Sequence, residues 1–405
     1  MACDRSFINV PVRRWMASFA VAWGLCGAMS AAALDLERPT AADAMSAPAV
    51  AIADSRVVVG RGGIAYDFAH SDTLTSVAAG DSRFVFVTQP LGQSVAILDR
   101  FSGRQVGQLP APPDGWLLPF SIRVPREGHV VVLDSGGFPN PAVPSVARVY
   151  DYDVRVDPVT RRIDARLTRT VRFDGLPLVF AEDVEVTSEG LYVVSESIIG
   201  ALWVIRADGS IAPGLFPSTG VPIATLAPCL FLPTTVGGVP FATGGNFGPG
   251  VVGLAERGGQ LYFSTTCNGG VFRIPVASLT DAMRDPFARA DDIRTVSARP
   301  PGIAETLHGL AFNHARPNDR WIYAADSLRL RVIRIDTRTG AREVVATDEE
   351  LFNFPSKLQF LPSVAGLAPL VVASDQEYRL PSINAAITAD ITQPPWIVTK
   401  LYVAP

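Results

Sequence analysis

The chain carries a repeated pattern of short apolar runs, each of which ends in a small or polar residue at a turn. The runs are rich in β-branched and aromatic residues, with Gly, Asp or Pro close by, which is typical of β-strands. They cover Phe84–Thr88, Val130–Asp134, Leu191–Ser195, Leu261–Thr265, Ile322–Asp326 and Leu370–Ser374. Their last residues are 46, 61, 70, 61 and 48 positions apart. These intervals indicate a repeat with insertions, close to the ~40–50 residues of a propeller blade.

Each run has the same kinds of neighbour. Another apolar segment precedes it, a third strand-like segment follows it, and a fourth is present in most units. Around Ile322–Asp326 these segments are Gly309–Phe312, Arg331–Asp336 and Arg342–Ala346. The unit is therefore a four-stranded antiparallel meander, which buries both of its faces when several units stack radially.

The pattern predicts an all-β fold, a six-bladed β-propeller of four-stranded antiparallel blades over residues 56–405. Strands from both chain ends are expected to close the ring, with Arg56–Val59 and Ile397–Val403 as candidates. Ser382–Ile387 is expected to supply the third strand of the sixth unit. A β-sandwich or two smaller β-domains is the competing architecture, but the repeats are spread evenly with no linker between halves.

The first 55 residues differ from the repeat region. Residues 1–33 resemble an export signal, since Arg13 and Arg14 precede an apolar stretch that ends at the small residues 31–33. Residues 34–55 are rich in Ala, Ser, Pro and Asp and predict a flexible leader. We therefore expect an exported protein, periplasmic or secreted. Removal of the signal leaves Cys229 and Cys267, which form one disulfide or remain two buried thiols.

The composition of the chain limits the classes of partner that the protein can bind. The 405 residues carry 35 Lys and Arg against 39 Asp and Glu, for a net charge of −4, and 48% of them are hydrophobic. The chain is too apolar to be disordered, and it has no basic excess for nucleic acid. Its one long apolar stretch is too short for a span of ~20 residues, so no stable membrane insertion is expected. A small molecule is the expected partner.

Antiparallel blades predict where a site would form. The residues just before the first strands and just after the second strands of all units converge on one mouth of the central channel, because neighbouring strands alternate in direction. The first group includes Glu182 and His308, and Lys357 follows nearby. The second group is rich in oxygen donors: Gln89, Asp134, Glu196, Asn268, Asp326, Asp375 and Glu377. Donors of this kind suit Ca²⁺ or another divalent cation.

Each candidate has a structural alternative. An Asp at a tight turn, such as Asp326 or Asp375, often bonds its own backbone. Glu182 and Asp183 place two acids at the start of an otherwise apolar strand, which favours a catalytic role. His308 is a candidate general base or ligand, or else a structural histidine. Asn246 lies in a Gly-rich insertion and is a candidate ligand, or part of a plain turn.

The segment from His308 to Asp336 resembles a blade of the gluconolactonase and strictosidine synthase-like six-bladed propellers, and Val252–Ile274 resembles it more loosely. The resemblance implies a metal-dependent lactonase or esterase, whose ion polarises the ester carbonyl and activates water. Among the residues at the mouth, the ion would be held by Glu182 and Asn246 with Asp326 or Asp375, and catalysis is expected from His308, Glu182 and Asp183. The candidates for substrate binding are Glu196, Asn268, Lys357 and Glu377.

Three functions remain open on the sequence. The first is an exported hydrolase of a lactone or related ester at a divalent-metal site in the channel. The second is a non-catalytic propeller that binds a ligand or a protein through the same mouth. The third is a quinoprotein-like sugar dehydrogenase, which needs cationic side chains for an anionic quinone. Lys357 and Lys400 are the two lysines of the chain, so arginines would have to substitute.

Overall fold

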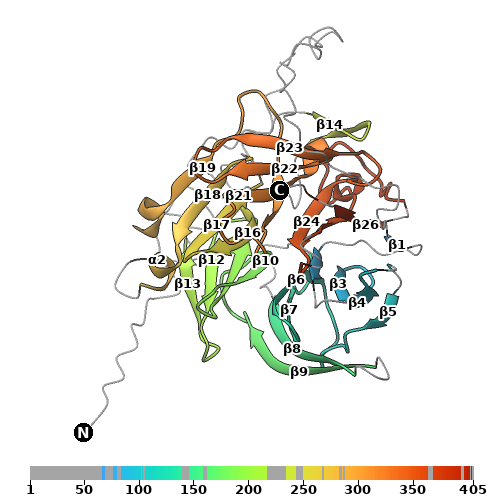
Figure 1. Ribbon diagram of the computed structural model, residues 1–405, viewed down its shortest axis with the longest axis vertical. Coiled ribbons are helices and arrows are strands. Elements are labelled where there is room, and N and C mark those ends of the chain that lie inside the picture. The colour runs from blue at the N-terminus through green and yellow to red at the C-terminus, as the bar shows by residue number, and fades with distance from the viewer. Residues whose placement is uncertain are drawn as a thin grey trace.

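Six four-stranded antiparallel sheets are arranged as the blades of a β-propeller in the computed structural model, and they follow one another around the ring in chain order (Figure 1). The structure describes residues 66–68, 76–79, 84–101, 103, 105–138, 146–157, 162–216, 234–242, 250–266, 269–281, 285, 288–363, 368–393, 396–401 and 403. The predicted signal and leader lie outside these residues.

The first strand of every blade lines the centre, since each contacts the first strand of the next blade and the last contacts the first. These inner strands are β2 (Ser76–Ala79), β6 (Pro119–Arg126), β10 (Ala181–Val186), β16 (Val251–Arg257), β20 (Leu307–Phe312) and β24 (Pro355–Phe360). The second strands are β3 (Phe84–Gln89), β7 (His129–Asp134), β11 (Tyr192–Glu196), β17 (Gln260–Thr265), β21 (Trp321–Asp326) and β25 (Leu370–Ser374). The six apolar runs of the sequence are these second strands, as the repeat predicts.

The outer half of each blade holds the third and fourth strands. The third strands are β4 (Ser94–Asp99), β8 (Arg148–Val156), β12 (Leu202–Ile205), β18 (Val271–Pro275), β22 (Arg331–Asp336) and β26 (Trp396–Leu401). The fourth strands are β5 (Gln105–Gln108), β9 (Ile163–Arg172), β13 (Ile211–Leu215), β19 (Arg294–Ser297), β23 (Arg342–Thr347) and β1 (Tyr66–Phe68). The remaining elements are β14 (Thr234–Val236), β15 (Val239–Phe241), α2 (Val276–Thr280), η4 (Ala288–Asp292), η5 (Ser327–Arg329) and η6 (Glu377–Arg379).

The sixth blade is built from both ends of the chain, as predicted. Its strand order is β24, β25, β26 and β1, so the early strand Tyr66–Phe68 completes a blade of late strands. The predicted strand Arg56–Val59 lies outside the described residues. The prediction of a third strand at Ser382–Ile387 is wrong, because β26 takes that place. Asn384 in that segment instead donates to the Pro240 and Tyr378 carbonyl oxygens, which ties the segment to the β14–β15 hairpin.

The buried apolar core is divided among the junctions between blades. Six of the hydrophobic clusters formed by the described residues each join two neighbouring blades, and together they run once around the ring. In the cluster that closes the ring, Val85 and Val87 of blade 1 pack with Val371 and Val398 of blade 6. A single meander cannot bury both faces, so the sheets are stable only as a closed ring.

Hydroxyl groups at the ends of second strands join successive blades. Thr88, Ser135, Ser264 and Ser327 each donate a side-chain hydrogen bond to a carbonyl oxygen at the start of the next blade's inner strand. The Ser135 bond to the Ala181 oxygen and the Ser327 bond to the Pro355 oxygen are both 2.5 Å long. Small polar residues at or just after the ends of the apolar runs therefore join neighbouring blades by hydrogen bonds.

Two glycines bring three inner strands into close contact. A Cβ atom on Gly309 of β20 would lie 2.7 Å from the Ser356 carbonyl oxygen and 2.8 Å from the Lys357 Cα atom of β24. A Cβ atom on Gly253 of β16 would lie 2.5 Å from the His308 carbonyl oxygen. Real Cβ atoms do not approach backbone this closely, so glycine is needed at both positions. The close approach holds His308 and Lys357 on adjacent strands.

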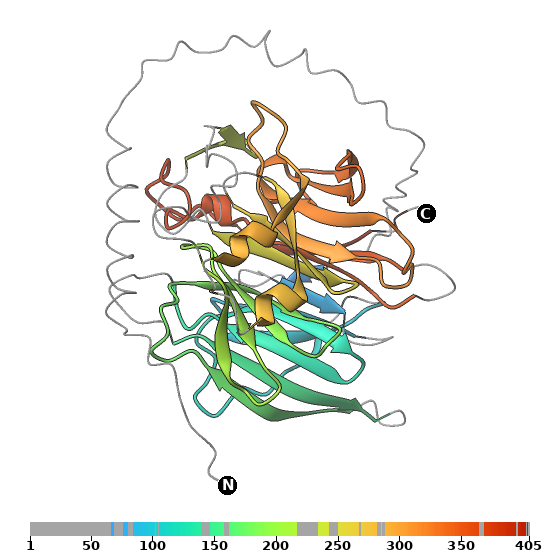
Figure 2. The same ribbon diagram turned by 90° about the vertical axis from the view of Figure 1, so that its left-hand side faces the viewer.

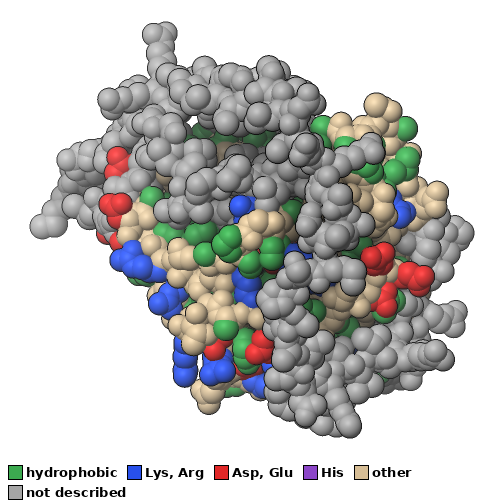
Figure 3. All heavy atoms as spheres, turned by 90° about the horizontal axis from the view of Figure 1, so that it is seen from above, with side chains coloured by type: hydrophobic (Ala, Val, Ile, Leu, Met, Phe, Trp, Pro, Cys, Tyr) green, Lys and Arg blue, Asp and Glu red, His purple; other side chains and the backbone are tan. Residues whose placement is uncertain are grey.

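The insertions lie around the ring without interrupting it. The helical segments α2 and η4 lie on the outer edge of blade 4 (Figure 2). On the face seen in Figure 3, basic and acidic side chains of the described residues are interspersed and form no patch of one sign. Within the described part of the chain, no helix is both long and apolar enough to cross a membrane.

Candidate functional site

A repeated irregularity at the start of the inner strands shapes the channel mouth. In five blades the pairing of the inner strand with the second strand shifts register within the first few residues, for example between Ala181 and Val184 and between Leu307 and Leu310. A bulge at a strand end redirects the side chains beside it. Glu182, Asp183 and His308 all lie within these shifts, at the mouth where the second strands end.

Asp183 is the centre of a buried hydrogen-bonded network. Its Oδ1 atom accepts from the Ser121 hydroxyl at 2.6 Å, and its Oδ2 atom accepts from Arg123 Nη2 and the Leu254 amide, each at 3.0 Å. Arg123 also pairs with Glu185 at 3.2 Å. Asp183 is fully buried and Arg123 is nearly so. This network links the inner strands of blades 2, 3 and 4 across the channel.

Lys357 brings a second cation to the same place from blade 6. Its Nζ atom donates to the Val252 carbonyl oxygen at 2.8 Å and lies 3.4 Å from Asp183 Oδ2. It also lies 3.9 Å from Glu182 Oε1. The side chain is 1% exposed. The predicted residues Glu182, Asp183 and Lys357 are therefore neighbours in the structure, although they come from two blades on different sides of the ring.

Three acids share the mouth with this lysine. Burial raises the pKa of Glu182 to about 7, opposed by the Lys357 charge and reinforced by the negative charge of Asp183. Burial raises the pKa values of Asp375 and Glu377 well above their usual range, the negative charge of Glu182 adds to both shifts, and Lys357 opposes both. Asp375 Oδ1 accepts from the Glu377 amide at 3.1 Å, while its buried Oδ2 has no hydrogen-bond partner among the described residues. The site is therefore rich in protonatable groups.

His308 is buried on β20, the inner strand next to the one that carries Lys357. Burial, followed by the Lys357 charge, lowers the pKa of His308 to about 3, so the imidazole is neutral at ordinary pH. Its Nδ1 atom lies 2.8 Å from the Ser327 hydroxyl oxygen. Its ring meets the ring of Phe354 edge to face, with centroids 5.5 Å apart. His308 thus joins Glu182, Asp375 and Glu377 as the fourth titratable group within the field of Lys357.

Two acids predicted at the mouth hold turns together. Glu196 Oε1 accepts from the Phe180 amide at 3.0 Å, and Oε2 accepts from the backbone amides of residues 198 to 200. Asp134 of the neighbouring blade does the same for the Leu117, Leu118 and Gly136 amides. Each carboxylate ties the end of a second strand to the start of its own blade. The structural alternative explains Asp134 fully, and the substrate-binding role of Glu196 stays a prediction.

Asp326 belongs to a different group of charges. Its Oδ2 atom lies 2.7 Å from Arg331 Nε, and Arg331 also pairs with the buried Glu305 at 3.3 Å. Glu305 in turn pairs with Arg342. Burial and the Glu305 charge raise the pKa of Asp326 to about 8. The structure does not bring Asp326 together with Glu182 and Asp375.

The predicted metal site is not assembled by the described residues. Asn246, like Asn268, lies outside them, and Asp326 is paired with Arg331. Across the part of the chain that the structure describes, no group of three or more His, Cys, Asp or Glu side chains is placed to hold a metal ion. The positive charge beside Glu182 is supplied by Lys357. The donors among the described residues thus do not fit a metal ion.

Two residues that contact the candidate site, Arg123 and Ser327, are not predicted from the sequence. Arg123 interrupts the apolar inner strand of blade 2 with a charge, and that interruption was a signal for a buried pair. Ser327 follows Asp326 at the end of a strand. Other blades have similar small polar residues at this position, and the sequence does not distinguish Ser327 from them. Which of those hydroxyls meets a histidine depends on the neighbouring strand.

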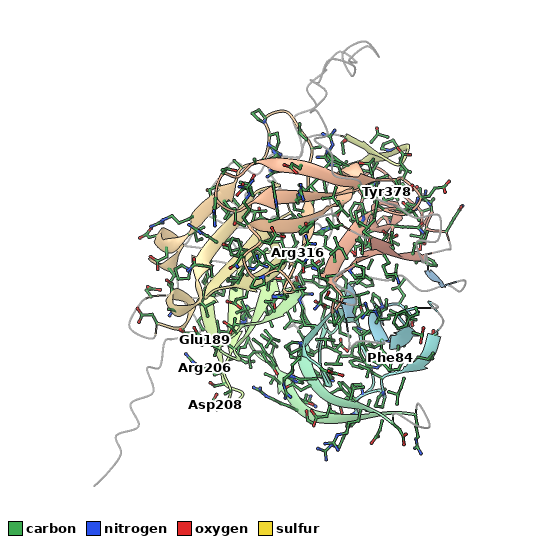
Figure 4. The ribbon with its side chains drawn as sticks, in the orientation of Figure 1. Phe84, Glu189, Arg206, Asp208, Arg316 and Tyr378 are labelled. Carbon is green, nitrogen blue, oxygen red and sulfur yellow. The ribbon has the colours of Figure 1, made fainter. Side chains whose placement is uncertain are left out.

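Apolar side chains flank the charged group on two sides. Phe120 and Phe180 stack edge to face with centroids 5.0 Å apart at the mouth of blades 2 and 3. Phe354 and Tyr378 lie 5.7 Å apart at blades 5 and 6, and Phe354 has a left-handed backbone with φ of 64°. A positive φ is rare for a residue as bulky as Phe354, and residues with such strained backbones cluster at functional sites. Tyr378 lies far from Glu189, Arg206 and Asp208, which mark outer turns of blade 3 (Figure 4).

Comparison with known proteins supports the fold. No family model matches the sequence, and no curated protein matches it. The PQQ-bound aldose sugar dehydrogenase from Streptomyces coelicolor is similar in structure, with a TM-score of 0.51 and 13% identity over 86% of this chain and 98% of that one. Virginiamycin B lyase from Staphylococcus aureus gives 0.48 and 10% over 84% and 98%. The calcium-binding protein regucalcin from Agrobacterium tumefaciens gives 0.47 and 16% over 82% and 92%.

These likenesses concern the fold. The six blades of this chain and the likeness to the aldose sugar dehydrogenase, also a six-bladed propeller, confirm the resemblance noted in the sequence at the level of the fold. Membership of the gluconolactonase family stays a prediction. At such identities the chemistry has to be argued from this chain's own residues.

Proposed function

We propose that the protein is a hydrolase of a small lactone or related ester, acting at the channel mouth. One observation carries the proposal: the buried ammonium of Lys357 lies 3.9 Å from Glu182 and 3.4 Å from Asp183, two acids of a blade on another side of the ring. The charge of Lys357 also acts on the pKa values of His308, Asp375 and Glu377. Groups whose pKa values are shifted by burial and a specific neighbour are typical of catalytic sites.

The groups supply what ester hydrolysis requires. A general base takes a proton from water as its oxygen attacks the carbonyl carbon, and a general acid returns a proton to the alkoxide oxygen when the C–O bond breaks. A base works best when its pKa is close to the working pH, which favours Glu182 at about 7. His308 is neutral and can take part in hydrogen bonds of the site, while the Lys357 ammonium favours the negative charge that develops on the carbonyl oxygen.

The experiment is a panel of lactones and esters assayed with the full chain and with Glu182→Gln. The amide keeps the shape of the side chain but cannot act as a base, so kcat/KM should fall by about 100-fold or more. Glu189→Gln is the matched control, since Glu189 is exposed on an outer turn of blade 3. No turnover above background by the wild-type protein, or equal turnover by both variants, would contradict the proposal.

Calcium or another divalent cation at this mouth stays a prediction from the family resemblance. Elemental analysis of the purified protein tests it directly, together with the same panel run with and without a chelator. A stoichiometric ion and a loss of turnover with chelator would support a ligand set that includes residues beyond those described. A metal-free protein that turns over at full rate would overturn the prediction.

A non-catalytic, ligand-binding propeller is the second candidate. It is favoured by the engagement of Asp183, Glu196 and Lys357 in internal bonds. It predicts that a compound binds at the mouth without being consumed. Saturable binding by calorimetry, with the compound recovered intact, would support this function over the hydrolase.

Export is proposed as well, on the signal-like residues 1–33. The test is to express the full chain with its start intact and to sequence the N-terminus of the protein recovered from the cell exterior or periplasm. A new N-terminus close to residue 34 would support export. Recovery of the intact chain from the cytoplasm alone would overturn it.

A further inference from the structure

The hydrogen bonds of Ser327 determine which nitrogen of His308 carries the proton. Ser327 Oγ donates its single proton to the Pro355 carbonyl oxygen at 2.5 Å, and a carbonyl oxygen can only accept. The contact of 2.8 Å between Ser327 Oγ and His308 Nδ1 therefore requires that Nδ1 be the donor. Neutral imidazole carries one N–H, so the basic lone pair is left on Nε2.

The surroundings hold this arrangement rigidly. Ser327 is fully buried, and its amide donates to the Thr306 carbonyl oxygen at 3.0 Å. His308 and Pro355 lie on adjacent inner strands, which Gly309 allows to approach within van der Waals contact. The Phe354 ring limits rotation of the imidazole from a third direction. The Ser327 hydroxyl is thus held between two blades, with His308 Nδ1 as its neighbour on one side.

We propose that Ser327 is a positioning residue, which holds His308 in the Nδ1–H form and so keeps the imidazole lone pair on Nε2 as a hydrogen-bond acceptor. The inference rests on the proposed function for the use of that acceptor in the reaction, but the proton position is a property of the resting protein. The role is the usual one of a group that orients a histidine from behind by bonding its other nitrogen. Ser327 contacts no substrate in this role.

The chain offers a closely matched control. Ser135 follows Asp134 at the end of β7 as Ser327 follows Asp326 at the end of β21, and it donates to the Ala181 oxygen at the same distance of 2.5 Å. Ala181 and Pro355 are each the first residue of the next inner strand. Ser135→Ala therefore removes an equivalent hydrogen bond between two blades. Among the bonds that the structure describes, Ser135 makes none to a histidine.

The test measures the proton position directly. In protein labelled with ¹⁵N-histidine, two-bond ¹H–¹⁵N correlations distinguish a protonated nitrogen from one with a lone pair, and the chain contains only 4 histidines to assign. The wild type and Ser135→Ala should show His308 protonated on Nδ1. Ser327→Ala should show a mixture or the Nε2–H form, and Ser327→Thr, which keeps the hydroxyl, should restore the wild-type pattern. Thermal melting of all variants reports whether each one is folded.

Kinetics then separate this inference from the proposed function. If Ser327→Ala changes the proton position and lowers kcat/KM by about tenfold or more while Ser135→Ala does not, the positioning role holds. An unchanged Nδ1–H form in Ser327→Ala would overturn it, whatever the activity. A changed proton position in a protein that hydrolyses nothing would retain Ser327 as the residue that sets the tautomer and would refute the hydrolase alone.

Discussion

Replacing Asp183 with alanine should cost far more stability than replacing an exposed aspartate. Removal of its carboxylate leaves Arg123 and the Leu254 amide buried without that acceptor. Breaking a buried ion pair by removing one partner costs about 3–5 kcal/mol. Arg123 keeps Glu185 as a partner at 3.2 Å, so we expect the lower end, about 3 kcal/mol.

The corresponding change in melting temperature follows from the size of the domain. An unfolding entropy of about 2.1 cal/mol/K per residue over roughly 350 residues is about 0.7 kcal/mol/K, so 3 kcal/mol lowers Tm by about 4 °C. Asp153→Ala is the control, because Asp153 is 40% exposed and lies 4.0 Å from Arg166, which is 78% exposed. Such a surface pair contributes about 0–1 kcal/mol.

The assay is urea unfolding at equilibrium, supported by calorimetry, on both variants and on Arg123→Met with and without Asp183→Ala. The double variant should lose at least about 1 kcal/mol less than the sum of the singles, because removing both charges leaves neither buried alone. Equal losses in Asp183→Ala and Asp153→Ala, within about 0.5 kcal/mol, would refute the reasoning. So would strict additivity of the two buried changes.

Two further predictions concern the mouth and the inner strands. Glu182 binds its proton more tightly in the folded protein, with a pKa of about 7 against an ordinary value of 4.5, so the free energy of unfolding should fall as pH rises through that window. Urea unfolding at several pH values should show a shallower fall for Glu182→Gln, and equal slopes would contradict the burial argument. Gly309→Ala should lose about 1–3 kcal/mol because its Cβ meets backbone at 2.7 Å, whereas Gly107→Ala, whose nearest atom is a side-chain carbon at 3.6 Å, should stay close to the wild type by thermal melting.

Much of the fold could be predicted because the repeat is visible one strand at a time. Runs such as Val130–Asp134 and Leu370–Ser374 have the composition of buried strands wherever they stand, and their spacing indicates blades. The third strand of the last blade could not be placed in the same way. Trp396–Leu401 and Ser382–Ile387 are both plausible strands locally, and the hydrogen bonds of Asn384 to the β14–β15 hairpin exclude the second.

The position of the candidate site could be predicted from the sequence, but the residues that contact one another in it could not. The alternation of strand directions correctly places Glu182 and His308 at the starts of inner strands and Asp326 at the end of a second strand. It does not tell which acids face each other. Asp326 meets Arg331 from its own blade, whereas Glu182 meets Lys357 from a blade three positions along the ring. Distances of that kind depend on the closed ring.

The sequence by itself determined the repeat, the strand composition and the mouth at which polar residues gather, because these follow from the local periodicity of apolar and polar positions. The tertiary structure alone decided what each polar residue does. Glu196 and Glu182 look alike along the chain, yet one accepts backbone amides of its own turn and the other lies beside a distant ammonium. The physical reason is that burial and charge are set by neighbours from other blades, which no local pattern records.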